Sequence, residues 1–460
     1  MEAGEEKEEE PAPEKVNSTL EEAHEGSVLD HSNTGTTSKQ TAWVTTGRGT
    51  WRHAGFHLAT TIATPAAFAP LPSAVAALGW PAGVISLVMG TLVTSYCSLL
   101  LANLWDYNEP NRYVRYRDLG RAIYGRTGYW SVTVFQQIAA IGNNITIQIV
   151  AGLSMQAIFV TYNTSDPSRV TLQEFIIIFG AAQLVLSQLP DIHSLRWFNA
   201  LCTFCTVAFT IVVMGLLIHA GQNKDGPTDY GVHGTPSNKV FGIFLALGTI
   251  AFSFGDAMLP EIQATIREPA KKNMYKGICL AYSVITTTYW LVAFLGYWAF
   301  GFAVQAYVVN SFSGPNWAIT MANVFAVIQV AGCFQIYCRP TYQYFEFQLL
   351  NPKQHRWSLY NSLARLLVTS IYTALVTLIA AAMPFFGDFV ALCGAIGFTP
   401  LDFIFPILAF LRVKRPKSRI FWAFNIGIVV LYTLVAILGA IGSIRYIVKD
   451  TVQYHFFQNQ

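Results

Sequence analysis

The stretch Phe252-Ser253-Phe254-Gly255-Asp256-Ala257-Met258-Leu259-Pro260 interrupts an apolar run with a flexible glycine, a proline and an ionisable carboxylate. Proline removes an amide donor from the helical ladder and blocks the ladder sterically, so we expect the helix to break here. Backbone groups freed at membrane depth are tolerated only where they line a cavity or are buried in protein. The stretch therefore predicts a broken membrane helix whose break has a function.

The composition is that of a protein with many membrane helices. Of the 460 residues, 53% are apolar and 12% are charged, about half the charged share of an average soluble protein. This excludes an ordinary soluble domain and predicts an all-α polytopic membrane protein with about 11 transmembrane helices. The expected spans are 51–78, 81–104, 129–160, 172–190, 198–220, 240–260, 277–303, 317–338, 366–386, 389–411 and 420–444.

The amino-terminal segment differs from the rest of the chain. Residues 1–50 hold 11 acidic residues against four basic ones, a net formal charge of −7. Few apolar residues and no periodicity predict that residues 1–48 are a disordered acidic tail, a candidate site for trafficking partners. Residues 49–460 then form the transmembrane domain.

Lysine and arginine in the loops predict the orientation, because these residues stay preferentially on the cytoplasmic side. With the amino terminus inside, the inner loops hold 19 of them and the outer loops hold three, Arg169, Lys224 and Lys239. An odd number of spans puts Tyr454–Gln460 on the other side. We therefore expect the acidic tail in the cytoplasm and the carboxyl terminus outside.

A second interruption lies in the first span, where three prolines fall within the ten residues 63–72. Taken alone, each interruption also fits an ordinary proline kink. Two interruptions five spans apart are what an inverted repeat of five plus five helices requires, and paired broken helices indicate a transporter's substrate site. We expect such a repeat, with helices one and six broken.

Four polar residues lie inside apolar runs. Asp256 costs about 3 kcal/mol to bury in charged form, so it is expected to be functional or paired. Asp402 either takes part in coupling or bonds neighbouring helices. Asn144 shares one face of the third span with Gln148, where the amides either contact substrate or join helices.

Several motifs resemble those of the plant amino acid/auxin permease family. Met258–Pro269 resembles the LPEIQAT signature of its GABA and proline transporter branches, and Gly49–Ile62, Arg115–Gly125, Met383–Phe389 and Gly397–Leu408 resemble other conserved blocks of these branches. The resemblance covers the chain from about residue 49 to its end. It implies a leucine-transporter-like fold of eleven spans and proton-coupled import of small amino acids or compatible solutes, bound where spans one and six are unwound.

Two departures from this family fall in the expected pocket. Thr64 stands where the first break usually has glycine, and Asp256 follows Gly255 where a small or amide residue is usual. The residues expected to bind substrate are Ala63, Thr64, Pro65, Ala66, Ala67, Asn144, Phe252, Ser253, Phe254, Gly255 and Asp256. These departures leave the identity of the substrate open.

A zwitterion fits the pocket that these residues suggest. Amides of the first break would hold its carboxylate, and the carbonyls of the sixth span with Asp256 would hold its ammonium. Burial favours the neutral form of a carboxyl group, so Asp256 or Asp402 alternatively carries the coupling proton. Sodium held by main-chain carbonyls also fits. Rocking of the bundle of spans one, two, six and seven would expose the site to each side in turn.

The expected function is proton-coupled symport of small neutral amino acids or compatible solutes, such as GABA and proline, across the plasma membrane. The alternatives are a broad-specificity neutral amino acid or auxin-like permease and a nutrient receptor that no longer transports. An enzyme is not expected, because the sequence has no HEXXH or GxSxG motif. The expected partners are the solute and the lipid bilayer, with no nucleic acid, no metal site and no cofactor other than the coupling ion.

Overall fold

The structure is a computed structural model that describes residues 49–107, 115–163, 170–188, 196–224, 226–350 and 358–453. Within these ranges the chain is almost entirely helical, and its one β-bridge joins Gly49 to Ile266. The expectations for residues 1–48 and 454–460 lie outside the described residues.

The elements follow one another as a series of helices, some of them broken. The α-helices are α1 (Trp51–Ile62), α2 (Pro65–Phe68), α3 (Leu71–Asn103), α4 (Tyr116–Tyr162), α5 (Leu172–Ser187), α6 (Arg196–Gln222), α7 (Pro236–Ser253), α8 (Leu259–Ala264), α9 (Ala270–Phe300), α10 (Asn316–Leu349), α11 (Leu359–Ala382), α12 (Phe386–Cys393), α13 (Phe405–Lys414) and α14 (Arg419–Gln453). A π-helix, η5 (Gly394–Ile404), joins α12 to α13, and short 3-10 helices cover Leu104–Asp106, Gly301–Ala303 (η3) and Val308–Ser311 (η4).

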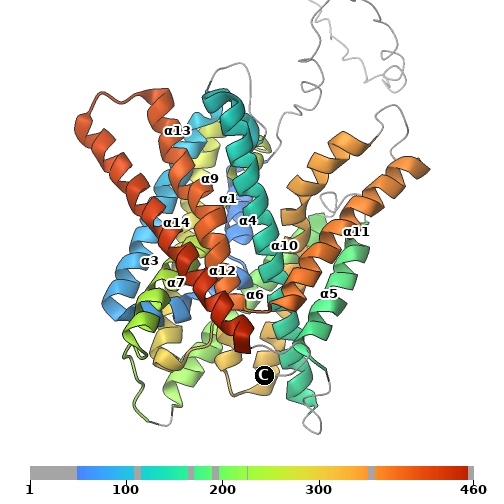
Figure 1. The fold of residues 1–460 in the computed structure, drawn as a ribbon, viewed down its shortest axis with the longest axis vertical. Coiled ribbons are helices and arrows are strands. Elements are labelled where there is room, and N and C mark those ends of the chain that lie inside the picture. Colours follow the sequence, from blue (N-terminus) through green and yellow to red (C-terminus); the bar gives the residue numbers. More distant parts are fainter. Residues whose placement is uncertain are drawn as a thin grey trace, which may run out of the picture. The chain divides into compact units, whose positions relative to one another are not determined.

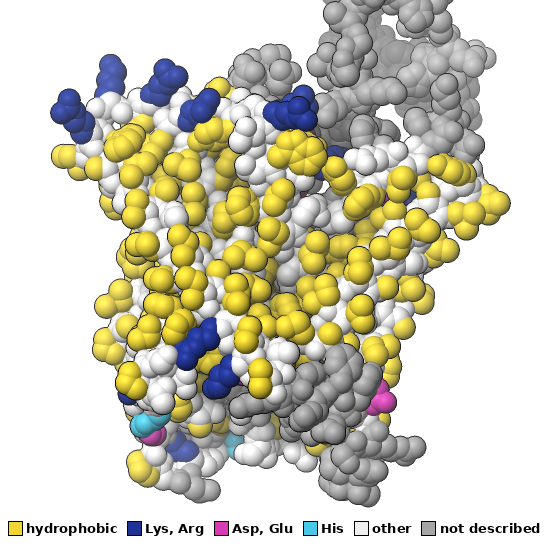
Figure 2. All heavy atoms as spheres, viewed as in Figure 1, with side chains coloured by type: hydrophobic (Ala, Val, Ile, Leu, Met, Phe, Trp, Pro, Cys, Tyr) yellow, Lys and Arg dark blue, Asp and Glu magenta, His cyan; other side chains and the backbone are white. Residues whose placement is uncertain are grey.

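Eight helical segments of the described chain are long and apolar enough to cross a membrane. Three predicted spans give no such helix of their own, because the first and sixth are broken and α5, the fourth, has only 16 residues. Figure 2 shows that hydrophobic side chains cover much of the visible face, while Lys and Arg gather at the end where α13 turns into α14. An exposed apolar surface of this extent is typical of contact with lipid.

Two glycines in left-handed backbone conformations divide helices that otherwise run on. Gly79 (φ 73°) separates the two parts of α3, where the sequence places the boundary between its first and second spans. Gly125 (φ 66°) separates the first turns of α4 from the part that corresponds to the third span. Glycine adopts positive φ without steric penalty, so both helices are interrupted at a residue that suits this conformation.

The helices pack into two groups with further helices between and across them (Figure 1). In one group α9 packs against α1 and α3, and α3 packs against α7. In the other, α4 packs against α5, α10 and α11. α6 contacts both groups through α9 and α10, while α14 lies across α7, α12 and η5. The first group contains the four spans expected to form the rocking bundle.

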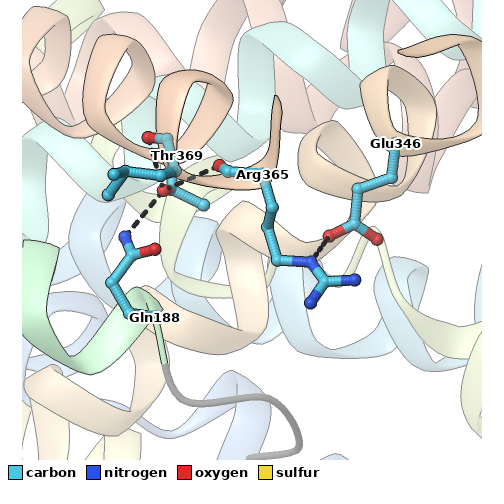
Figure 3. Close-up of polar contacts among 5 residues, drawn as sticks. Gln188, Glu346, Arg365 and Thr369 are labelled. Atoms are coloured by element: carbon cyan, nitrogen blue, oxygen red, sulfur yellow. Dashed lines mark hydrogen bonds and ion pairs between the residues drawn. The ribbon is translucent and has the colours of Figure 1, made fainter. Parts of the chain in front are cut away.

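Polar contacts fix the ends of α5, α10 and α11 in the second group (Figure 3). Arg365 Nε of α11 lies 3.1 Å from Glu346 Oε1 of α10, and the two side chains are only 13% and 19% exposed. Gln188 Nε2, directly after α5, donates to Thr369 Oγ1 of α11 over 2.8 Å. Three helices are therefore held together by an ion pair and a side-chain hydrogen bond.

Candidate substrate and coupling site

The first break separates α1 from α2. Ala63 leaves the helical conformation (φ −78°, ψ 69°), and Thr64 caps the next helix by accepting a hydrogen bond from Ala67 N at 3.2 Å. Pro65 suits the first position of that helix, because the amide it lacks would have no helical partner there. Thr64 thus supplies the cap on which the helix restarts.

The second break lies between α7 and α8, within the stretch Phe252–Pro260. α7 ends at Ser253, and Pro260 lies in the first turn of α8. Thr94 Oγ1 donates to Phe254 O over 3.2 Å and so satisfies a carbonyl of the break. A Cβ on Gly255 would lie 2.3 Å from the ring of Phe398, so this close approach requires glycine.

The two breaks meet through hydrogen bonds and aromatic contacts. Ser253 Oγ donates to Ala67 O over 2.6 Å. The hydroxyl of Tyr289 in α9 lies 2.7 Å from Ser253 O and 2.9 Å from Ile62 O, so one side chain contacts both breaks. All eleven residues expected at the substrate site are buried. The structure therefore brings ten of them, 63–67 and 252–256, into one closed region.

Asp256 and Asp402, the two coupling candidates, are in direct contact. Asp256 N donates to Asp402 Oδ2 over 2.8 Å, and Met258 N donates to Asp256 Oδ1 over 3.1 Å. Asp256 Oδ2 is buried and has no hydrogen-bond partner among the described residues. No ion pair in the described part of the chain joins either carboxyl group to Lys or Arg. Burying two neighbouring negative charges in this way is costly, so the arrangement favours binding of a proton or a cationic group.

The π-helix explains why Asp402 reaches the sixth-helix break. η5 packs against α7 so closely that a Cβ on Gly394 would lie 2.0 Å from Gly248 O. Thr399 Oγ1 donates to Gly394 O, five residues earlier, over 2.7 Å. π-Helical segments are rare and occur frequently at functional sites. This element was not predicted from the sequence.

A third carboxyl group, that of the half-buried Glu261 in α8, was not selected from the sequence. Gln136 Nε2 donates to Glu261 Oε1 and to Ala257 O, both over 3.2 Å, and Tyr116 N donates to Glu261 Oε1 over 3.3 Å. Tyr116 OH also donates to Leu401 O over 2.6 Å, so α4 contacts both α8 and η5 here. The signal was available, because Glu261 is an acidic residue beside a broken apolar run, as Asp256 is.

Asn144 lies apart from these bonds, on a face of α4 that contacts α11. Its Nδ2 donates to Tyr372 OH over 2.9 Å, and Gln148 Nε2 donates to Thr377 Oγ1 over 2.9 Å. Both amides therefore join helices, which is the second of the two roles that the sequence allows. Asn144 Oδ1 is buried without a partner in the described chain, and its contact with substrate stays a prediction.

Comparison with known proteins relates the chain to a protein family. Residues 47–445 match the family described as transmembrane amino acid transporter protein. The chain belongs to this family. It is 35% identical to GABA transporter 1 of Arabidopsis thaliana over 90% of this chain and 94% of that protein. It is 31% identical to lysine histidine transporter-like 1 of the same plant, over 88% and 90% of the two chains.

Solved structures share the fold at low sequence identity. MhsT in complex with L-phenylalanine has a TM-score of 0.51 at 10% identity, covering 86% of this chain and all of the other. A Na+-coupled sialic acid symporter has a TM-score of 0.52 at 11% identity, covering 90% and 92%. The fold is the leucine-transporter-like one with broken helices one and six, as predicted. The chain is an integral membrane amino acid transporter, and its relatives and fold are not those of enzymes.

Proposed function

We propose that this chain is a proton-coupled symporter that carries small neutral amino acids or compatible solutes, GABA and proline first among them. In this proposal it lies in the plasma membrane, with the amino terminus in the cytoplasm and the carboxyl terminus outside. The distribution of Lys and Arg between the two sets of loops supports this orientation.

The contact between Asp256 and Asp402 is the observation that carries the coupling proposal. Two neighbouring buried carboxyl groups have no ion pair with Lys or Arg in the described chain, while Asp256 Oδ2 has no donor. A proton bound to one carboxyl group lowers the cost of burying both. In the proposed division of roles, Asp402 carries the proton and Asp256 Oδ2 receives the ammonium of the substrate.

The breaks themselves support a small substrate. Ala63, Ala66 and Ala67 make up most of the first break, and the ring of Tyr289 packs on those of Phe68 and Phe254 beside it. The substrate carboxylate is assigned to the first break and the ammonium to the sixth, so that a zwitterion bridges α1–α2 and α7–α8. The name of the similar GABA transporter 1 supports GABA as the first candidate.

Proton binding then provides the driving force for uptake. Each charge that moves down the membrane potential supplies about 2.3 kcal/mol per 100 mV, in addition to the pH gradient. Asp256 belongs to the break between α7 and α8 and Asp402 to η5, so their protonation is linked to how these elements pack. The α1, α3, α7 and α9 group moves as the bundle that opens the site to each side in turn.

Uptake of labelled GABA and proline into cells that express the full chain tests the proposal. Saturable uptake that is stronger at acidic than at neutral outside pH, and unchanged when choline replaces sodium, is the expected result. Uptake that requires sodium at constant pH would identify sodium, and not the proton, as the coupling ion. Absence of uptake by protein shown to be at the cell surface would favour the receptor alternative.

A broader specificity is the second candidate, because a relative of 31% identity is named a lysine histidine transporter-like protein. Competition of labelled GABA uptake by unlabelled lysine, histidine and neutral amino acids separates the two. Inhibition by GABA and proline alone supports the narrow specificity, and inhibition by lysine, histidine and most neutral amino acids supports the broad one.

A further inference from the structure

The short helix α8 lies between the two helix groups and contacts both. It packs against α1, α3 and α9 of the first group and against α4 of the second. Polar side chains of α8 form hydrogen bonds in both directions, Gln263 with the first group and Glu261 with the second. At α8 the two groups are therefore joined directly.

The bonds on one side connect α8 to the first group. Gln263 is only 1% exposed, and its Nε2 donates to Ala102 O of α3 over 3.2 Å. Directly after α8, Thr265 O accepts from Gly49 N over 3.0 Å, and Arg267 N donates to Gly49 O over 2.9 Å. The chain before α1 thus pairs with the chain after α8. These contacts join elements that move together when the first group rocks.

Glu261 forms the bonds on the other side. Its Oε1 accepts from Tyr116 N and from Gln136 Nε2, both of α4. The same Nε2 donates to Ala257 O, directly after Asp256 in the break. Glu261 Oε2 is buried and has no hydrogen-bond partner in the described chain. Two donors from different parts of α4 therefore converge on one carboxyl group of α8.

Separation of α8 from α4 removes these bonds together. Hydrogen bonds to a charged acceptor are about twice as strong as those between neutral groups, and a buried acceptor without donors is costly. We propose that Glu261 is a positioning residue of the transport cycle. Its bonds to Tyr116 and Gln136 hold the first group against the second and so close the substrate site on the side of α8, and they break when the site opens to that side.

The loops beside this contact indicate which side it closes. Arg115 precedes α4, and Arg267 and Lys271 follow α8, in loops whose basic residues predict a cytoplasmic location. The bonds of Glu261 therefore close the site toward the cytoplasm. This inference rests on the orientation and the rocking motion of the proposed function.

Gln263 provides the matched control, because it lies on the same short helix and also forms a buried hydrogen bond. A bond within the first group stabilises the fold in every state of the cycle. A bond between the groups exists only while they are in contact, so its loss also changes the balance between the states. Glu261 and Gln263 should therefore differ in their effect on opening.

The distance between two spin labels measures the opening in the purified full-length protein, without any transport assay. One label is attached at Thr265→Cys, directly after α8, and the other at Arg121→Cys, in the first turns of α4; both positions are exposed. All proteins compared also carry Cys202→Ser and Cys279→Ser, which remove the cysteines that are partly or fully exposed. Separation of α8 from α4 lengthens the distance between the labels.

Glu261→Ala is expected to raise the ratio of long to short label distances about tenfold, as for the loss of one hydrogen bond to a charged group. Gln263→Ala is expected to keep the wild-type ratio. Glu261→Gln retains an oxygen that accepts from Tyr116 and Gln136 without the charge, so its ratio should lie between those of the wild type and Glu261→Ala. It also provides the test if Glu261→Ala does not fold. A wild-type ratio in the Glu261 variants, or an equal rise in Gln263→Ala, overturns the proposal.

GABA transport provides the second readout. If fewer molecules face outward, the apparent affinity for outside substrate falls in proportion. Glu261→Ala should therefore raise KM for outside GABA and accelerate the release of GABA from preloaded cells, whereas Gln263→Ala should change neither. An unchanged KM together with unchanged release in Glu261→Ala contradicts the proposal.

The label distances also separate this inference from the proposed function. A shift in Glu261→Ala but not in Gln263→Ala, with no proton-coupled uptake by the wild type, supports the closing role of Glu261 and rejects the proposed function. Proton-coupled uptake by the wild type without any shift in Glu261→Ala rejects this inference alone.

Discussion

The backbone N–H of Asp256 donates a 2.8 Å hydrogen bond to the carboxylate of Asp402, 146 residues later in the chain. The bond joins the unwound part of the sixth predicted span to the π-helix between α12 and α13. A change of charge on Asp402 therefore acts directly on the backbone of the break.

Two substitutions at Asp402 separate its charge from its hydrogen bond. Asp402→Asn retains an oxygen that accepts from Asp256 N, so the thermal stability should stay near that of the wild type while the acceleration of uptake by acidic pH is lost. Asp402→Ala leaves the Asp256 amide without its acceptor and should lower the free energy of unfolding by about 1–3 kcal/mol. Thermal unfolding in detergent and uptake at two pH values measure both effects. Equal stability losses in the two variants would argue against this hydrogen bond.

Asp256→Asn should weaken substrate binding, because Asp256 Oδ2 is the buried atom assigned to the substrate ammonium. Replacing a charged acceptor by a neutral one should raise KM by about tenfold, equivalent to about 1.4 kcal/mol. The concentration dependence of GABA uptake measures it. A KM equal to that of the wild type would remove Asp256 from the substrate site.

Tyr289→Phe should loosen the contact between the two breaks, because the lost hydroxyl lies within hydrogen-bond distance of Ile62 O and Ser253 O. Loss of one such bond corresponds to about 1 kcal/mol, or about fivefold in KM. Tyr230→Phe is the matched control, since its hydroxyl donates to Trp298 O outside the breaks. If both variants change KM equally, the effect does not come from the breaks.

Gly255 packs against η5, and Gly394 belongs to it. Replacing either by alanine should destabilise the protein, but a second substitution should restore only the Gly255 variant. Gly255→Ala places a Cβ against the ring of Phe398, so it should destabilise the protein, and Phe398→Ala in the same chain should recover part of the loss. Gly394→Ala instead meets the backbone oxygen of Gly248, which no side-chain truncation removes. Yield of folded protein by size-exclusion chromatography distinguishes the two. Recovery of Gly394→Ala by Phe398→Ala would contradict this explanation.

Breaking the ion pair between Arg365 and Glu346 should destabilise the second helix group without altering coupling (Figure 3). Arg365→Ala leaves a mostly buried carboxylate unpaired, which should cost about 2 kcal/mol. The free energy of unfolding is expected to fall, while the pH dependence of the remaining uptake stays that of the wild type. A changed pH dependence would assign this pair a part in transport.

The breaks could be predicted from the sequence because their causes are local. Pro65 and Pro260 end the helical ladder, Gly255 permits a close approach, and an aspartate inside an apolar run indicates a site regardless of its partners. The boundary between the first two spans was likewise predictable, since Gly79 and Pro81 favour a break in the helix there.

The partners of these residues could not be predicted, because they come from distant parts of the chain. Gln136 reaches Glu261 from 125 residues away, and Tyr289 of α9 contacts Ile62 O, 227 residues earlier in the chain. The π-helix was also missed, since its glycines and Pro400 equally fit an ordinary kink. Asn144 is buried, but its bond to Tyr372 depends on how α4 packs against α11, and its contact with substrate stays a prediction.

Measuring proton movement during substrate uptake shows whether the chain couples the two. The full-length protein is reconstituted into vesicles that contain a pH-sensitive dye, and GABA is added outside at equal pH on both sides with an inside-negative potential. We expect GABA-dependent acidification of the vesicle interior by the wild type, and none by Asp402→Asn although the variant still binds GABA. GABA uptake by the wild type without acidification, or the same acidification by Asp402→Asn, would contradict it.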